Sequence, residues 1–137
     1  MPIFKRSLKN MGVRLYVCPI DGVQQPTLTE LRKACAEIEA VYAISIEWKN
    51  RCHGSLCSIF FGSEEDGGLV VGVDSEGDGD FVSFHEEGGD WLTYLRWVRA
   101  IARYTGDQLV VCGADGGPFT VQAEASDEAL QSILDEM

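Results

Sequence analysis

Short connections rich in glycine and acidic residues constrain the fold of this chain most. Residues 62–67 and 74–80 each separate two apolar runs, and neither is long enough to return the chain across a sheet for a parallel strand. Both segments have the composition of hairpin loops. The sequence therefore predicts an antiparallel meander of four strands, within 42–48, 55–61, 68–73 and 81–85.

One amphipathic helix is predicted before this meander in the sequence, and another after it. Thr27 and Glu30 have the spacing of a capping box at the start of the first helix, which we expect to end near Ala40. Asp90 is placed to cap a second helix over residues 91–104. Three arginines at helical spacing predict a basic stripe on the side of this second helix opposite its apolar side: Arg96, Arg99 and Arg103.

The whole chain is predicted to be an α+β domain with a mainly antiparallel sheet, in the order β-α-β4-α-β2-α. Two of the helices are longer, and a short C-terminal helix follows a cap at Ser126. We expect one domain over residues 12–137, since no repeat or linker divides it. Residues 1–11 are expected to be a basic N-terminal tail, and Met11 is an alternative start.

The acidic residues of this chain are concentrated in one part of it. The sequence has 22 Asp and Glu against 11 Lys and Arg, a net charge of -11, and it has no Lys or Arg between Arg51 and Arg96. Such a field repels nucleic acid and anionic lipid and favours a basic partner. Ten acids lie in this interval: Glu64, Glu65, Asp66, Asp74, Glu76, Asp78, Asp80, Glu86, Glu87 and Asp90.

A small protein with this charge pattern is expected to be a protein-binding inhibitor that covers the active site of a basic toxin or nucleic-acid enzyme, as immunity proteins do. Acidic groups would steer the encounter and an aromatic side chain would anchor the complex. Trp91 and Trp97 are six residues apart on the second helix, so they cannot share a face and one should be only partly buried. The expected contact residues are Glu64, Glu65, Asp66, Asp74, Glu76, Asp78, Asp80, Glu86, Glu87, Trp91 and Trp97.

Alternative functions remain open at this point. A small enzyme or ligand-binding domain could use Cys52, His53 and His85, although their spacing matches no zinc motif. The segment from Asp74 resembles the start of a calcium loop, but His85 stands where the bidentate Glu is needed. A secretion chaperone would also be small and acidic. We expect no enzymatic activity, no metal and no cofactor, and the oligomeric state stays undetermined.

The five cysteines favour a reduced, cytoplasmic protein. Most of them lie in or beside apolar runs, where a free cysteine behaves as a small hydrophobic residue. The first 20 residues lack the apolar core of a signal peptide, and no run reaches the length of a membrane span. The expectation is therefore free thiols in the cytoplasm.

Overall fold

A computed structural model describes residues 16–17, 25–50, 57–62, 68–75, 82–113 and 117–136. Its strands are β1 (Tyr16–Val17), β2 (Ile46–Asn50), β3 (Cys57–Phe61), β4 (Leu69–Ser75), β5 (Val82–Gly89), β6 (Gln108–Cys112) and β7 (Phe119–Gln122). Its helices are α2 (Leu28–Tyr42), α3 (Trp91–Tyr104) and α4 (Asp127–Glu136). The predicted fold class is confirmed, because the described elements follow the order β-α-β4-α-β2-α.

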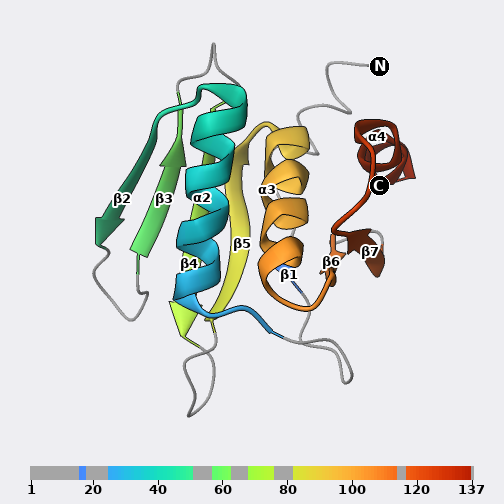
Figure 1. Ribbon diagram of the computed structural model, residues 1–137, viewed down its shortest axis with the longest axis horizontal. Helices are drawn as coiled ribbons and strands as arrows, with labels where there is room; N and C mark the ends of the chain where they lie inside the picture. The colour runs from blue at the N-terminus through green and yellow to red at the C-terminus, as the bar shows by residue number, and fades with distance from the viewer. Residues whose placement is uncertain are drawn as a thin grey trace.

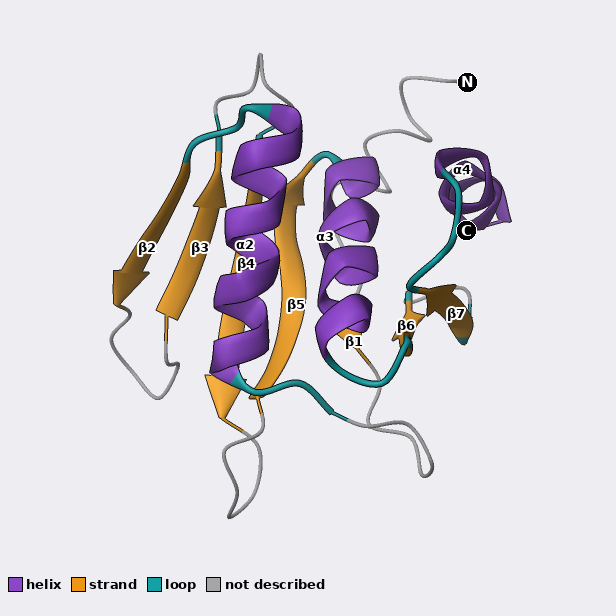
Figure 2. Cartoon of the chain, viewed as in Figure 1, coloured by secondary structure: helices purple, strands orange, loops and turns teal. Residues whose placement is uncertain are grey.

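The described strands form one antiparallel sheet in the order β2-β3-β4-β5-β1-β6-β7. Helices α2 and α3 lie side by side over one face of this sheet, and α4 lies beside α3 near β7 (Figure 1; Figure 2). The predicted meander is β2 to β5, in which each strand pairs with the next one in the sequence.

Aromatic side chains fill the space between α3 and the sheet. Trp97 is fully buried, and its ring centroid lies 4.8 Å from that of Phe84 and 5.4 Å from that of Phe61, both in edge-to-face geometry. Tyr94 joins the same group through Phe84. A buried aromatic group of this kind stabilises the core through its large apolar area and through its edge-to-face contacts.

The starts of the two long helices differ from each other. Asp90 caps α3 as predicted, since its side chain accepts a hydrogen bond from the backbone N–H of Leu92 at 3.2 Å and from the hydroxyl of Thr93 at 2.8 Å. The capping box predicted for α2 is wrong. Thr27 precedes the helix, but its hydroxyl donates to the side chain of Glu30 and makes no capping bond to the backbone.

Helix α2 also extends two residues beyond its predicted end. Ala43 follows it in a left-handed conformation, with φ 55, and this turn ends the helix. Tyr42 therefore belongs to the last turn of α2, and β2 begins only at Ile46. In the sequence, Tyr42 fits both the helical spacing of α2 and the alternation of the following strand. The turn at Ala43 ends the helix and separates it from β2.

Candidate functional site

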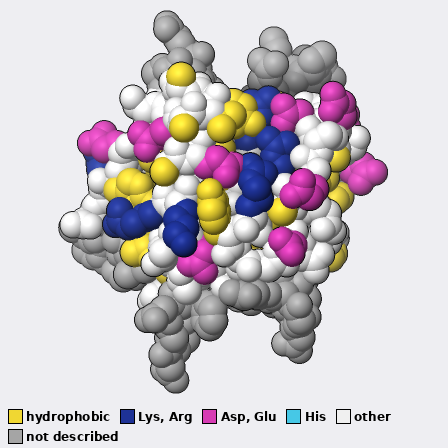
Figure 3. Space-filling view, viewed as in Figure 1, with side chains coloured by type: hydrophobic (Ala, Val, Ile, Leu, Met, Phe, Trp, Pro, Cys, Tyr) yellow, Lys and Arg dark blue, Asp and Glu magenta, His cyan; other side chains and the backbone are white. Residues whose placement is uncertain are grey.

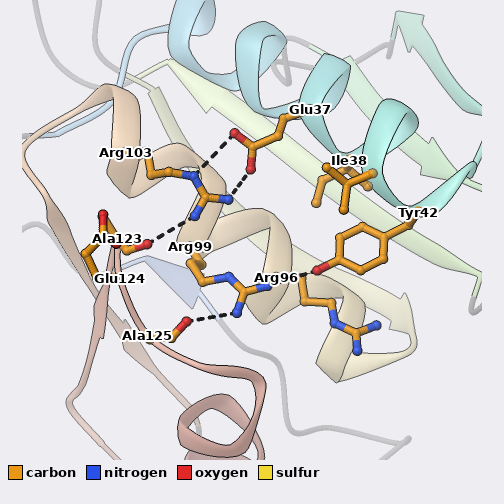
Figure 4. A pocket seen from close by; sticks show the side chains of 10 residues that line it. Glu37, Ile38, Tyr42, Arg96, Arg99, Arg103, Ala123, Glu124 and Ala125 are labelled. Atoms are coloured by element: carbon orange, nitrogen blue, oxygen red, sulfur yellow. Dashed lines mark hydrogen bonds and ion pairs between the residues drawn. The ribbon is translucent and has the colours of Figure 1, made fainter.

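A cavity of about 250 Å³ lies between α2, α3 and the connection from β7 to α4 (Figure 4). Three arginines on successive turns of α3 line it, and we call Arg96, Arg99 and Arg103 the arginine cluster. On the helical face of the molecule, Lys and Arg side chains gather over α2 and α3 with acidic side chains among them (Figure 3). The predicted basic stripe therefore faces α2 and the connection from β7 to α4.

Arg99 is the most buried member of the cluster, with a relative exposure of 9%. Its Nη1 donates to the carbonyl oxygen of Ala125 at 2.9 Å, and its Nη2 donates to the hydroxyl of Tyr42 at 2.9 Å. The same guanidinium pairs with Asp127 at the start of α4, at 2.9 Å. Arg99 thus joins the end of α2 to the connection that leads into α4.

Arg96 and Arg103 make similar contacts one turn before and one turn after Arg99 on α3. Arg96 also pairs with Asp127, at 3.2 Å, and its guanidinium stacks over the ring of Tyr42. Arg103 forms a bidentate pair with Glu37 of α2 and donates to the carbonyl oxygen of Ala123 at 3.0 Å. The hydrogen bonds from Arg103 hold the pKa of Glu37 below its ordinary value, and those from Arg96 and Arg99 do the same for Asp127.

These contacts define what the arginine cluster can do. Two of its three charges pair with Glu37 and Asp127, and a third carboxylate, Glu124, also lines the cavity. The Nε groups of Arg96 and Arg99 are buried and have no hydrogen-bond partner in the described part of the chain. Most of the cluster's donors hold the helical layer together, because they bind carbonyls and carboxylates of α2 and of the segment leading into α4.

The described residues that flank the two acidic segments lie at opposite ends of the sheet. In an antiparallel meander, successive connections leave from opposite ends of the strands. Gly62 and Gly68, on either side of residues 63–67, lie at one end, where Gly68 accepts a backbone hydrogen bond from Asp90 at 2.9 Å. Ser75 and Val82, on either side of residues 76–81, pair at the other. We call these the Gly68 end and the Ser75 end.

The seven residues of β4 separate the two ends by roughly 20 Å. Asp74 lies at the Ser75 end, and Glu87 and Asp90 lie near the Gly68 end. The predicted contact residues Glu64, Glu65, Asp66, Glu76, Asp78 and Asp80 lie outside the described residues. Among the described residues, Asp74 therefore lies at one end of the meander, and Glu87 and Asp90 lie near the other.

Two of the predicted contact residues are wrong. Trp97 is fully buried in the aromatic core and has no surface to offer a partner. Glu86 is 3% exposed, because it alternates with Val82 and Phe84 on the side of β5 that faces the helices. This orientation could not be recognised in the sequence, because Glu86 and Glu87 are adjacent in a polar run that shows no alternation of polar and apolar residues.

Trp91 and Glu87 agree better with a surface role. Trp91 is half-buried at the first position of α3, directly after the exposed cap Asp90. The side chain of Glu87 is 21% exposed and lies 4.0 Å from the ring of His85. The register shifts between Val70 and Val71, so that Glu87 lies between the Val70–Gly88 and Val71–Glu86 pairs. The Gly68 end therefore combines acidic groups with an accessible aromatic side chain.

The cysteines differ from the sequence expectation. Cys112 is disulfide-bonded, so the expectation that all thiols are free is wrong at this position. Because disulfides persist mainly in oxidising compartments, this bond weakens the argument for the cytoplasm. Cys35 and Cys57 are buried and form no disulfide. Burial raises the pKa of the Cys35 thiol to about 12, which makes it a poor nucleophile.

Comparison with known proteins gives no relative for this chain: no family model, no curated protein and no solved structure matches it. None of the helices that the structure describes has the length and apolar character needed to cross a membrane. Within the described residues, no group of three or more His, Cys, Asp or Glu side chains is arranged to hold a metal ion.

Proposed function

We propose that this chain is a protein-binding inhibitor that neutralises a basic partner, such as a toxin or a nucleic-acid enzyme, by covering its active site. The observation that carries this proposal is the charge distribution along the chain. Ten acids and no Lys or Arg lie between Arg51 and Arg96, whereas the other 12 acids nearly balance the 11 basic residues. Charge that is not balanced within the chain is available to attract a partner of opposite sign.

The Gly68 end is the part of the molecule that we propose contacts the partner. The acids 64–66 belong to the segment that connects Gly62 and Gly68 in the sequence, and the described acids Glu87 and Asp90 lie near this end. Trp91 supplies the aromatic group that interface centres commonly use as an anchor. The Ser75 end has a similar number of acids, but no half-buried tryptophan is described beside it. Among the described residues, the acids Glu87 and Asp90 occur together with Trp91 at the Gly68 end.

The enzyme alternative has no specific observation in its favour. Cys52 and His53 lie outside the described residues, so the structure does not test them. The third residue of that set, His85, lies in the middle of β5 and has Glu87 at 4.0 Å, which is longer than a hydrogen bond. We therefore do not propose a second function.

The first test is to identify the partner and measure inhibition directly. A tagged copy of the chain would capture the partner from cells, and the partner's own activity would then be measured with and without the purified chain. We expect a basic partner whose activity is lost at equimolar inhibitor. Its association rate should fall steeply as salt rises, because exposed charges are screened within about 10 Å at 0.1 M. A captured partner that stays fully active, or that binds at a rate independent of salt, would overturn the proposal.

The place of action remains part of the proposal. A cytoplasmic inhibitor would carry Cys112 as a free thiol, whereas an inhibitor in an oxidising compartment would keep the disulfide. Alkylation of the thiols in intact cells, followed by mass spectrometry, distinguishes the two. Protection of Cys112 from alkylation would place the complex outside the reducing cytoplasm.

A further inference from the structure

Strand β2 forms one edge of the sheet, and none of the other described strands pairs with its outer side. The hydrogen-bond pattern tells which of its backbone groups are left over. The N–H of Gly62 donates to the carbonyl oxygen of Ser45 at 2.6 Å, so Ser45 and Gly62 form a hydrogen-bonded pair across β2 and β3. Since hydrogen-bonded pairs alternate along an antiparallel ladder, the N–H and C=O groups of Ile46, Trp48 and Asn50 point outward.

The two faces of β2 carry different side chains. Ile46 and Trp48 face the helices, where they pack against the core, and Arg32 of α2 stacks over the Trp48 ring at 4.4 Å. Glu47 and Lys49 lie on the opposite face, with side chains 68% and 56% exposed. The outward edge of β2 is therefore flanked by one acid and one base on its open face and by a half-buried tryptophan on its helical face.

The backbone allows a second copy of β2 to pair with the first in three central antiparallel registers. Each register must place outward-pointing residues opposite one another, and the charges on the open face distinguish them. Pairing Ile46 with Trp48 of the second copy places Glu47 opposite Glu47, and pairing Trp48 with Asn50 places Lys49 opposite Lys49. Pairing Trp48 with Trp48 instead places each Glu47 opposite Lys49 of the other copy. Like charges directly opposite destabilise a sheet and opposite charges stabilise it.

We propose that two copies of this chain pair antiparallel along β2, with Trp48 opposite Trp48 and two Glu47–Lys49 pairs across the interface. Each of these pairs occupies a non-hydrogen-bonded position, where the Cα atoms approach to about 4.5 Å and the side chains are closest. The two seven-stranded sheets become continuous, and both copies of Trp48 lose exposed surface. Of the three registers, this is the one in which no two like charges of β2 lie directly opposite each other.

This proposal does not depend on the proposed function, because it rests on the backbone and the charges of β2 and not on the acids of the Gly68 end. A charged edge strand has another common role, which is to prevent strand pairing. The two roles predict opposite behaviour when the signs of the charges are exchanged. An edge that only prevents pairing leaves the protein monomeric whichever residue carries which sign, whereas a pairing edge depends on the match between positions 47 and 49.

The test is the oligomeric state of the full chain, measured by sedimentation over a range of concentrations. We expect a dimer whose dissociation constant rises by about tenfold or more in Lys49→Glu, because both cross-strand pairs become acid opposite acid. Glu47→Lys should weaken the dimer similarly by placing base opposite base. The double variant Glu47→Lys with Lys49→Glu should restore the dimer, because each acid again faces a base.

Lys33→Glu provides the matched control. It makes the same change in net charge on α2, but Lys33 leans over the ring of Tyr104 on the side away from β2. It should leave the dissociation constant of the dimer within a factor of about two. A monomeric wild-type chain would overturn the proposal. So would a double variant that stays monomeric, or a Lys33→Glu variant that dissociates as readily as Lys49→Glu. Thermal unfolding of each variant checks that it is folded. If one of the two single variants does not fold, the other one provides the test.

Discussion

The arginine cluster of α3 and the acidic segments, residues 64–66 and 74–80, have opposite charge and different expected roles. The cluster acts within the fold, and the acidic segments are proposed to act on a partner. In the cluster, Arg99 and Arg103 meet carboxylates and backbone carbonyls from other elements, and Arg96 shares Asp127 with Arg99. The acidic segments lie in a part of the sequence that supplies no Lys or Arg at all. Charges that are paired within the fold stabilise it, whereas an excess of one sign is available to attract other molecules. Substitutions in the two regions should therefore change different measurements.

Loss of Arg99 should have the largest effect on stability. Arg99→Met keeps much of the buried apolar stem but removes the hydrogen bonds to Tyr42 and Ala125, so we expect the free energy of unfolding to fall by about 2 kcal/mol. Urea denaturation measures this change. The control Lys33→Met, at an exposed position of α2, should stay within about 0.5 kcal/mol of wild type. Equal effects of the two variants would mean that the arginine cluster does not hold the helical layer together.

Asp90 is an acid of the Gly68 end that also has an internal partner. Asp90→Ala removes the cap of α3 and should lower the free energy of unfolding by about 1 kcal/mol. Asp90→Asn removes the same negative charge but retains a capping oxygen, so its stability should remain near that of wild type. If both variants lose the same stability in thermal unfolding, the charge of Asp90 matters rather than its cap.

The pairing of Glu37 with Arg103 predicts how stability depends on pH. The hydrogen bonds from Arg103 hold the pKa of Glu37 below its ordinary value of 4.5 in the folded protein. A carboxyl group with a lowered folded pKa contributes stability that is complete above its unfolded pKa and is lost as the pH falls through its folded pKa. We therefore expect the free energy of unfolding to decrease as the pH is lowered from about 5 to about 3.

Glu37→Gln isolates the part of this decrease that belongs to one pair. The variant should lose about 0.5 kcal/mol at neutral pH, because a partly exposed pair contributes little, and its pH dependence should be shallower. Adding Arg103→Gln should leave the pH dependence as shallow as in Glu37→Gln alone. A slope in Glu37→Gln that equals the wild-type slope would show that Glu37 is not paired in solution.

Much of the fold could be predicted from the sequence because local patterns and tertiary contacts agree in it. The cap at Asp90 and the apolar spacing after it locate α3 to the residue. The short connections require an antiparallel meander, and the structure has one. At Tyr42 the pattern was ambiguous, because a residue at a helix-to-strand junction fits both periodicities until a turn such as Ala43 separates them.

The candidate site could be predicted only in part, because its contacts join residues distant in sequence. Helical spacing showed that Arg96, Arg99 and Arg103 share a stripe, but their partners Glu37 and Asp127 come from other helices. The burial of individual residues also could not be predicted from the sequence. Trp97 and Trp91 look alike in sequence, and only the packing of α3 against Phe61 and Phe84 distinguishes the core residue from the surface one.

Neutralising the two acidic groups separately tests the central claim, that a basic partner binds at the Gly68 end. One variant combines Glu64→Gln, Glu65→Gln and Asp66→Asn, and its matched counterpart combines Glu76→Gln, Asp78→Asn and Asp80→Asn. Both remove three negative charges, so the change in net charge is the same and only the location differs. The measurement is the association rate with the identified partner at low salt. We expect a fall of about tenfold for the first variant and a clearly smaller one for the second. Equal rates in the two variants and in wild type, unchanged by salt, would contradict it.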